Sequence, residues 1–401
     1  MAGQLSGPIL IIAGTRPEAV KLAPLVLHLR ARGEQVLMVA TGQHRDLFAE
    51  ALAGFGLAAD IDLGVMAPSP EAEVAALVPA LAALIRDHQP AWVVVQGDTS
   101  STLAGALAAR YAGVPLAHVE AGLRTGTDDP HPEEMHRKLV AQLAQLHCAP
   151  TAAAAAALAA EGVSDGVHVT GNTGIDALLL MAARLQANAA LADAAAAPFA
   201  HVPRSVPGGR PWLLATIHRR ENRGRPLAAV LAALGELARE AEVLLPVHPS
   251  PEVAGPVLAT LNGRAGVHLL PALPYASFVA LMLRSRLVLT DSGGVQEEAP
   301  ALGLPCLVLR DGTERPEGLA SGNARLVGTR RAAIVAAARS LLHDEVLHAR
   351  MAVPALPYGD GRAAQAISDV LWRPAVPASA RTSESSSGSA ARRQSSPAVP
   401  R

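Results

Sequence analysis

The chain has 401 residues, half of them apolar, and a formal net charge of −1. This length and composition allow two domains of ordinary size. The near-zero charge gives no general attraction for nucleic acid or an anionic membrane, and no uninterrupted apolar run is long enough to span a bilayer. Because the first residues lack the basic start and cleavage site of a signal peptide, we expect a cytoplasmic protein with no nucleic-acid or membrane partner.

The first part of the chain alternates short β-like apolar runs with helix-length amphipathic stretches. The apolar runs lie at 8–14, 35–42, 91–98 and 115–122, and the helical stretches between them lie at 17–33, 43–56 and 100–113. This rhythm is typical of βαβ units and predicts a mainly parallel sheet.

The same rhythm restarts after a weaker, alanine-rich stretch between residues 182 and 211. The later β-like runs lie at 212–218, 242–248, 267–272, 286–294 and 304–309, and a last helical stretch lies at 359–372. We therefore predict an α/β fold with two domains, at 1–170 and 171–357. The segment 374–401 is rich in Ser, Ala, Pro and Arg, which predicts a disordered tail.

Polar residues directly after strands are the first candidates for a site, because ligands bind at the carboxyl ends of open parallel sheets. In the first domain, Arg16 lies at the turn after the first run, where a helix N-terminus favours phosphate. Lys21 follows in the same helix. Asp98 and Glu120 lie at the ends of two later strands, and Glu133 begins a helix. Acids at neighbouring strand ends can face one cleft, where their pKa values are pushed apart.

Each of these residues also has an ordinary structural explanation. Arg16 could cap a surface turn, and Lys21 could be a solvated helix residue, although it is one of only two lysines in this arginine-rich chain. Carboxylates near a helix start commonly cap it or balance its dipole. We prefer that explanation for Glu134. Helix capping is a less sufficient explanation for Asp98 and Glu120, because both follow apolar strands.

The second domain offers a matching set of residues. His218 ends the run at 212–218, and His248 ends the next one. The stretch LTDSGG then places three backbone N–H groups at a helix N-terminus, which is a cradle for pyrophosphate; these belong to Ser292, Gly293 and Gly294. Glu298, one turn into that helix, could accept the paired hydroxyls of a ribose. The histidines could instead be core residues with satisfied hydrogen bonds.

Several common site classes are not indicated by this sequence. It contains neither the GxGxxG pattern of a nicotinamide site nor a phosphate-binding loop for ATP, and no GxSxG elbow. No spacing of His, Cys and Asp resembles a metal site. We expect Cys148 and Cys306 to be buried free thiols, and we expect no metal or redox cofactor.

The chain resembles the non-hydrolysing UDP-N-acetylglucosamine 2-epimerases over about residues 8–372. The matching motifs occur in order: GTRPEAVKLAPL, TGQHRDL, GDTSSTLA, HVEAGLRTG, PEEMHRKL, VTGNTGIDAL, HRREN, PVHP, LTDSGGVQEEAPALGLP and RDGTERPEG. The resemblance implies a glycosyltransferase-B-like architecture of two Rossmann-like domains with the active site in the cleft between them. It also implies a helix at 358–373 that crosses back to the first domain, and a homodimer.

The resemblance implies roles for individual residues. The family's UDP and phosphate contacts fall on Arg16, Lys21, His218, Phe278, Ser292, Gly293, Gly294, Glu298 and Arg315. Its catalytic carboxylates fall on Asp98, Glu120 and Glu133, with His218 at the same site. Gln43, His44 and His248 are candidates for a secondary or activating site.

The chain departs from the family pattern at three places. Leu273 stands where Gln is usual, the stretch at 65–73 lacks the usual Gln residues, and His136 replaces Asn in a segment one residue short. These differences affect one uracil contact, the activating site and the position of Glu133.

The implied reaction inverts carbon 2 of UDP-N-acetylglucosamine, giving UDP-N-acetylmannosamine, through elimination and re-addition of UDP. Three alternatives stay open from the sequence. They are a hydrolysing 2-epimerase, a glycosyltransferase on the same scaffold, and a UDP-sugar-binding module without catalysis.

Overall fold

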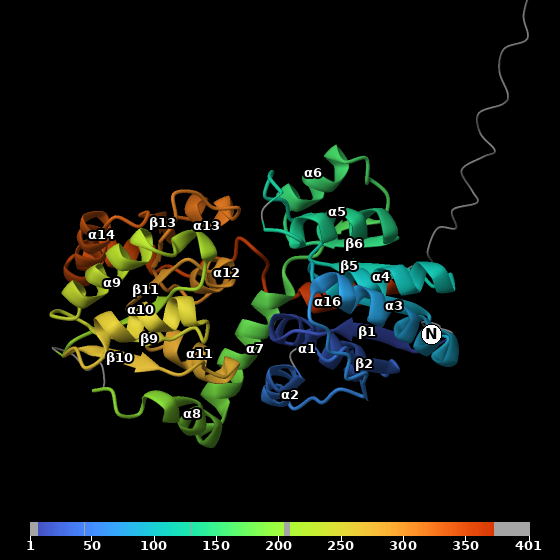
Figure 1. Cartoon of the computed structure of the whole chain (residues 1–401), viewed down its shortest axis with the longest axis horizontal. Helices are drawn as coiled ribbons and strands as arrows, with labels where there is room; N and C mark the ends of the chain where they lie inside the picture. The colour runs from blue at the N-terminus through green and yellow to red at the C-terminus, as the bar shows by residue number, and fades with distance from the viewer. Residues whose placement is uncertain (1–6, 44, 129, 204–208, 373–401) are drawn as a thin grey trace, which may run out of the picture.

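The computed structural model describes residues 7–43, 45–128, 130–203 and 209–372. The chain forms two α/β halves side by side, each with a parallel sheet between helices (Figure 1). The predicted fold class, two Rossmann-like domains with mainly parallel sheets, is confirmed. The exact domain boundary near residue 170 stays a prediction, and the segment 374–401, predicted to be disordered, lies outside the described residues.

The first sheet has seven strands in the order β3-β2-β1-β4-β5-β6-β7. Its strands are β1 (Ile9–Ala13), β2 (Val36–Ala40), β3 (Ile61–Asp62), β4 (Trp92–Gln96), β5 (Leu116–Val119), β6 (Leu146–Ala149) and β7 (Val167–Val169). Its helices are α1 (Arg16–Ala31), α2 (Arg45–Gly54), α3 (Pro70–His88), α4 (Ser100–Ala112), α5 (Glu133–Leu143) and α6 (Ala152–Ala160). The central strand β1 pairs with β2 and β4, so that Ile9 is in register with Val36 and Trp92.

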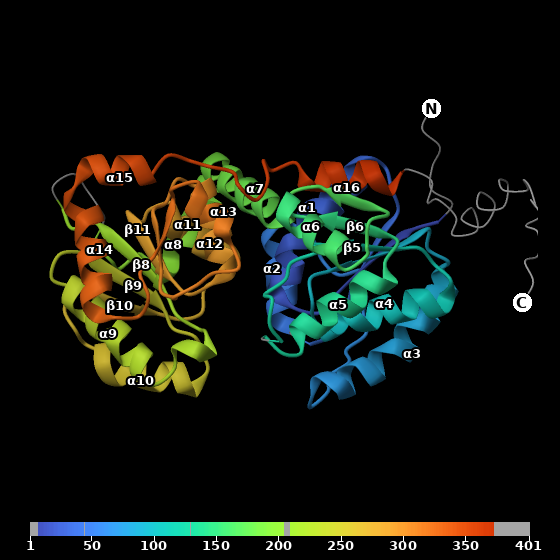
Figure 2. The same cartoon turned by 90° about the horizontal axis from the view of Figure 1, so that it is seen from above.

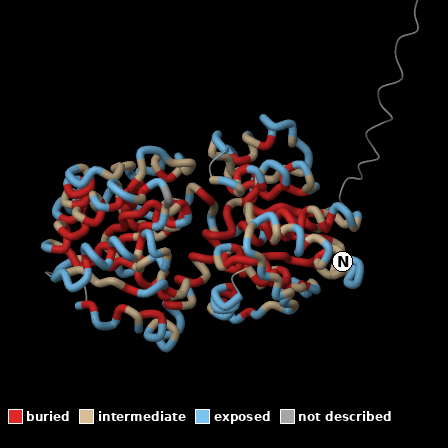
Figure 3. Tube along the Cα trace, viewed as in Figure 1, coloured by how far each residue is buried: buried red, intermediate tan, exposed pale blue. Residues whose placement is uncertain are grey.

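Strand β1 is buried on both faces, which explains why its sequence is a continuous apolar run. Successive side chains point to opposite faces of the sheet. Ile9 and Ile11 pack in the cluster that contains α1 and α7 (Thr173–Ala187), whereas Leu10 and Ile12 pack in the cluster that contains α3 and α4. Figure 3 shows buried residues concentrated in the interior of each half. The residues at the carboxyl ends of these strands are therefore attached to a sheet that is packed on both faces.

The second sheet has six strands in the order β10-β9-β8-β11-β12-β13. Its strands are β8 (Trp212–Thr216), β9 (Glu242–Pro246), β10 (Val267–Leu270), β11 (Leu287–Thr290), β12 (Cys306–Val308) and β13 (Ala324–Leu326). Its helices are α9 (Arg225–Leu237), α10 (Pro251–Leu261), α11 (Tyr275–Met282), α12 (Gly293–Ala301), α13 (Pro316–Ala320), α14 (Arg331–His343) and α15 (Glu345–Met351), with a 3₁₀ turn η2 (Arg220–Asn222).

The alanine-rich stretch that weakens the sequence pattern is helical. It forms the end of α7, then α8 (Ala189–Ala196) and the 3₁₀ turn η1 (Ala197–Phe199). Helix α7 lies between the two halves, and α16 (Ala363–Leu371) returns to lie beside α1 (Figure 2). The indole Nε1 of Trp92 donates to the carbonyl of Leu371 at 3.0 Å, and Arg32 pairs with Asp369. The last helix is thereby fixed to the first half.

Both cysteines are free and fully buried, as the sequence predicts. Burial raises the pKa of each thiol to about 12, so neither is a nucleophile at neutral pH. Among the described residues, no group of three or more His, Cys, Asp or Glu side chains is arranged to hold a metal ion.

Within the described residues, none of the single helices has both the length and the apolar character that a bilayer span needs. The segments Thr173–Ala187 and Ala189–Phe199 meet those criteria only when taken together, across a bend of 110°.

Asp176 caps the returning helix, because its carboxylate accepts the backbone N–H groups of Ala363 at 3.2 Å and Ala364 at 2.8 Å. We expect Asp176→Ala to lower the free energy of unfolding by about 1–2 kcal/mol, the usual cost of a lost helix cap. Denaturant unfolding should be compared with that of Asp193→Ala, which removes an exposed acid from α8. Equal unfolding curves for the two variants would show that the cap contributes nothing.

Candidate active site

A cavity of about 470 Å³ lies between the two halves, at the carboxyl ends of the second sheet's strands. Its first-half wall is mainly the start of α1, and its second-half wall follows β8, β9 and β11 and includes α11. It is lined by most of the residues that the sequence singled out: Arg16, Lys21, His218, His248, Phe278, Ser292, Gly294 and Glu298. This volume is in the usual range for a small-molecule site.

Two backbone N–H groups directly before α1 are satisfied within the protein. One oxygen of Glu18 accepts the backbone N–H groups of Gly14 at 3.0 Å and Thr15 at 2.7 Å, and the other accepts the hydroxyls of Thr99 and Thr102. The sequence suggested phosphate binding at this helix end, but a carboxylate already occupies those two N–H groups. An anion in the cavity would therefore meet the side chains of Arg16 and Lys21 at the start of α1.

Lys21 and Glu120 form a buried ion pair with 2.5 Å between Nζ and Oε1. The amide of Gln96 donates to the other oxygen of Glu120. Burial by itself would raise the pKa of this carboxyl, but Lys21 and the more distant Arg315 and Arg137 lower it overall. Glu120 has a left-handed backbone (φ 66°), so these contacts hold an uncommon conformation at the end of β5.

Asn172 connects this pair to the second half. Its amide nitrogen donates to Glu297 at 2.8 Å and, at 3.3 Å, to Glu120, while its side-chain oxygen caps α7 at Gly174. Glu297 in turn accepts from the guanidinium of Arg315 at 2.7 Å. A continuous polar network therefore crosses between the two halves at the start of α7.

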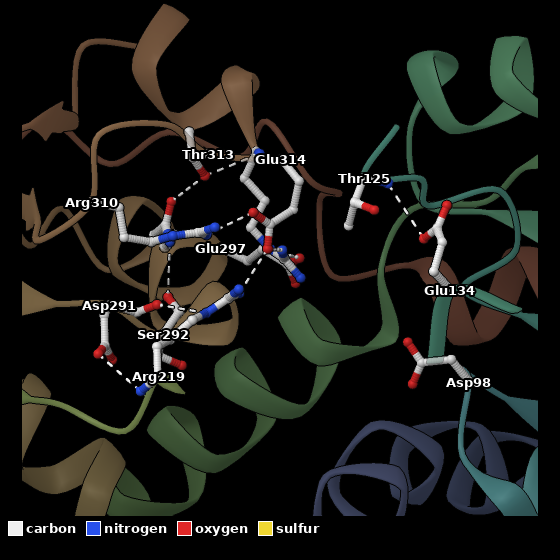
Figure 4. Close-up of polar contacts among 12 residues, drawn as sticks. Asp98, Thr125, Glu134, Arg219, Asp291, Ser292, Glu297, Arg310, Thr313 and Glu314 are labelled. Carbon is white, nitrogen blue, oxygen red and sulfur yellow. Dashed lines mark hydrogen bonds and ion pairs between the residues drawn. The ribbon is translucent and has the colours of Figure 1, made fainter. Parts of the chain in front are cut away.

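Three arginines surround the carboxylate of Glu314, and Figure 4 labels two of them, Arg219 and Arg310. Its oxygens lie 2.8 Å from Arg219, 2.6 Å from Arg310 and 2.5 Å from Arg315. Although burial opposes ionisation, these cations lower the pKa of Glu314 to about 2. Arg315 also passes close over Gly293, where an added Cβ would lie 2.5 Å from the guanidinium carbon. This explains why glycine stands at the first position of α12.

Asp291 holds the loop that carries His218. It is fully buried, and its oxygens accept the backbone N–H groups of His218 at 3.1 Å and Arg219 at 3.0 Å. The Nδ1 atom of His218 also lies 3.1 Å from Asp291, and its ring stacks on His248 with 6.3 Å between centroids. Because Nδ1 is engaged, Nε2 is the ring atom left for a ligand in the cavity.

The acids of the first half lie opposite the arginine cluster. Asp98 lies just beyond the end of β4, and Glu120 directly follows the neighbouring strand β5. Asp98 pairs with Arg137 at 2.5 Å. Glu134 is 1% exposed and pairs with the same guanidinium, so it has a specific partner in addition to its place at the helix start. Glu133 begins α5, and its Oε2 atom is enclosed without a hydrogen-bond partner among the described residues.

Figure 4 shows Asp98 and Glu134 on the side of the first half that faces Arg219, Arg310 and Glu314. A second cavity, of about 550 Å³, lies between the halves here. Its first-half wall includes residues 122–125, Thr127, Pro130 and Thr151, and its second-half wall includes Arg219, Arg310 and Glu314.

The residues predicted for a secondary site do not line one common cavity. Gln43 lines a separate cavity of about 190 Å³ with residues 65–70 and Glu73, whereas His248 lines the main cavity. His44 lies outside the described residues. Leu273 is buried, and its carbonyl accepts a hydrogen bond from Arg16.

Several residues that the structure places at the site were not predicted as site residues from the sequence. They are Gln96, Asn172, Tyr275, Asp291, Glu297 and Glu314. Asp291 directly follows β11, so the strand-end rule could have found it. Tyr275 and Asn172 carry no such signal, because their partners come from distant segments of the chain.

Comparison with known proteins gives a consistent result. The sequence model of the family described as UDP-N-acetylglucosamine 2-epimerase matches residues 27–372. A Ralstonia solanacearum protein named probable UDP-N-acetylglucosamine 2-epimerase is 44% identical, over 90% of this chain and 98% of its own. The UDP-N-acetylglucosamine 2-epimerase of Escherichia coli K12 is 40% identical over the same shares of the two chains. The crystal structure of the Neisseria meningitidis UDP-GlcNAc 2-epimerase bound to UDP-GlcNAc has a TM-score of 0.84 at 38% identity, covering 91% of this chain and 99% of that one.

The Lys21–Glu120 contact predicts that the ammonium group is needed at this position. Lys21→Arg keeps the charge, but a planar guanidinium is too wide to take the place of Nζ. We expect ligand binding or turnover to weaken by about tenfold or more, ~1.4 kcal/mol. Lys138→Arg, at the chain's other lysine, is the matched control, since Lys138 is half exposed. Parent-like binding and turnover in both variants would mean that position 21 needs only charge.

Proposed function

Since the chain belongs to the UDP-N-acetylglucosamine 2-epimerase family, we propose that it interconverts UDP-N-acetylglucosamine and UDP-N-acetylmannosamine. The observation that carries this proposal is the 470 Å³ cavity, where α1 cations face the glycine-rich start of α12 and Glu298; the carboxylates Asp98, Glu120 and Glu133 are not among its lining residues. The ligand bound to the Neisseria relative, UDP-GlcNAc, is the substrate we assign to this chain.

In the proposed complex, the second half binds most of the UDP. The backbone N–H groups of Gly293 and Gly294 lie in the first turn of α12, where an anion is favoured, whereas the N–H of Ser292 already donates to the Thr290 hydroxyl at 2.9 Å. Glu298 receives the ribose hydroxyls, and Phe278 lies beside the base. Arg16, Lys21, His218 and Arg315 surround the pyrophosphate.

The proposed chemistry begins with cleavage of the bond between carbon 1 and the UDP oxygen. The electron pair leaves with UDP, and the carbon 1 centre becomes oxocarbenium-like, which loosens the proton on carbon 2. Loss of that proton gives a 2-acetamidoglucal and UDP. Protonation of carbon 2 from the opposite face and return of UDP to carbon 1 give the epimer. Prearranged cations and N–H dipoles stabilise the charge of the departing pyrophosphate.

Inversion in both directions requires two groups that each remove and deliver a proton, on opposite faces of the sugar. We assign these roles to Asp98, whose carboxylate pairs with one cation, Arg137, and to Glu133, rather than to Glu120, whose oxygens accept from Lys21, Gln96 and Asn172. The lowered pKa of Glu120 keeps that residue ionised. Its fixed negative charge suits stabilisation of the cationic centre rather than delivery of a proton.

We propose the non-hydrolysing reaction, in which UDP returns to the intermediate and free sugar is not released. This requires water to be kept from the glucal, and closure of the two halves over the cavities between them would do so. We also retain the homodimer and the cytoplasmic location as proposals that rest on the resemblance.

Isotope exchange tests the reaction directly. In deuterated water with UDP-N-acetylglucosamine, we expect deuterium at carbon 2 of intact UDP-sugar, because protonation draws on solvent-exchangeable carboxyls. Mass and NMR analysis of the sugar nucleotide reports it. Epimer without deuterium would rule out the elimination route, and free N-acetylmannosamine as the main product would indicate the hydrolysing reaction.

Replacement of Asp98 tests its assigned role. Asp98→Asn keeps the shape but removes the proton-accepting group, so we expect turnover to fall by about 10²-fold or more while UDP binding changes little. Asp87→Asn, which alters an exposed residue of α3, is the control. Turnover close to that of the control would show that Asp98 takes no part in proton transfer and serves only as the ion-pair partner of Arg137.

A further inference from the structure

Tyr275 contacts both halves of the molecule at the edge of the main cavity. It is the first residue of α11, and its hydroxyl donates to Oε1 of Glu298 at 3.0 Å. Its ring lies 6.0 Å, centroid to centroid, from the ring of Phe55, a buried residue that follows α2 in the first half. Tyr275 therefore connects a carboxylate of the second half to the core of the first.

Among the described residues, the Tyr275 hydroxyl is the one hydrogen-bond donor to Glu298. Both residues line the main cavity. With Oε1 held by the phenol, Oε2 is the oxygen free to accept from a ligand.

Polar and charged groups from three elements, α1, α11 and α12, act on Glu298. Burial is the largest influence and raises its pKa, and the adjacent Glu297 adds to this effect. The Tyr275 hydrogen bond and the α1 cations Lys21 and Arg16 oppose it, and the resulting pKa is about 7. Glu298 is therefore partly protonated near neutral pH. Removal of one hydrogen-bond donor would change the ionised fraction measurably in that range.

Tyr275 itself remains a donor throughout this range. Burial and the neighbouring Glu298 raise the pKa of its phenol well above 10. The hydroxyl stays protonated at every pH where Glu298 titrates, so it favours the ionised carboxylate, which is the better acceptor.

We propose that Tyr275 is a positioning residue for ribose recognition: it holds one oxygen of Glu298 so that the other meets the ribose hydroxyls, and its ring contact with Phe55 makes this arrangement depend on the first half. The inference rests on the proposed function, in which the UDP ribose lies against Glu298. It adds a residue that the sequence did not indicate and a link between sugar recognition and the relative position of the halves.

The simpler explanation is that Tyr275 only fills space between α11 and α2. The two explanations differ in what the hydroxyl does. A packing role leaves ribose recognition and its pH dependence intact when the oxygen alone is removed. If Tyr275 has a positioning role, removal of its hydroxyl should weaken ribose recognition and move its pH dependence to higher pH.

The test is calorimetric titration of UDP and 2′-deoxy-UDP into the wild-type protein and Tyr275→Phe, from about pH 6 to about pH 9, a range that brackets the carboxyl titration. The ratio of the two dissociation constants isolates the ribose contact, because phosphate ionisation is common to both ligands. Tyr111→Phe is the matched control, since Tyr111 lies on α4 and is 80% exposed.

For the wild type, we expect a preference for UDP of about tenfold or more at high pH, the scale of a hydrogen bond to a charged group. The preference should fall as the pH drops through the Glu298 pKa. Loss of the phenol donor raises that pKa, so Tyr275→Phe should lose its preference at a higher pH. At pH 7 we expect its preference to be about threefold or more below that of the wild type, and at high pH we expect it to stay below the wild-type value, because the ionised carboxylate is no longer held in place; full recovery at high pH would reduce the role of Tyr275 to an effect on the pKa of Glu298.

Phe55→Leu tests the link to the first half, because it removes the aromatic contact and keeps the site apolar. We expect its UDP preference to shift in the same direction as that of Tyr275→Phe. An unchanged preference would overturn the dependence on the first half.

An unchanged preference in Tyr275→Phe at every pH would overturn the positioning role. Failure of the wild-type protein to bind UDP at all would instead contradict the proposed function, so the two failures are distinguishable.

Discussion

A buried chain of charged and polar side chains holds the two halves of this protein together at the site. It runs from Lys21 to Glu120, through the amide of Asn172, to Glu297 and Arg315. Buried charges are costly unless they are paired and hydrogen-bonded, and removal of one partner leaves the next uncompensated. Asn172 is the single uncharged link, and it also caps α7. The start of α7 therefore links the two halves and positions Glu120 and Glu297.

In this arrangement the cations of the site are already paired with carboxylates before an anionic ligand binds. Lys21 is already paired with Glu120, and Arg315 with Glu297 and Glu314. The cations are thus oriented by carboxylates before any phosphate binds, and little reorganisation is needed as negative charge develops on a leaving group. The same carboxylates prevent the cavity from carrying a large unbalanced positive charge when it is empty.

The architecture could be predicted because it depends on local sequence patterns. Continuous apolar runs such as residues 9–13 are buried on both sheet faces, and helix-length stretches follow them. Strands β3, β6, β7 and β13, with two to four residues each, were not among the predicted runs, because such short segments lack a long apolar pattern. The helical nature of residues 189–199 was also missed, because alanine-rich sequence has weak amphipathic periodicity.

The sequence by itself determined which residue types stand at strand ends, and hence the candidates Asp98, Glu120, His218 and the glycine-rich start of α12. Only the tertiary structure decided their partners. Asn172 meets Glu297 from 125 positions away, and Tyr275 meets Phe55 across the two halves. A carboxylate's charge, its pKa and the oxygen that it presents depend on neighbours brought together by folding. Residue order along the chain does not specify those neighbours, because the contacts join elements that are remote in sequence.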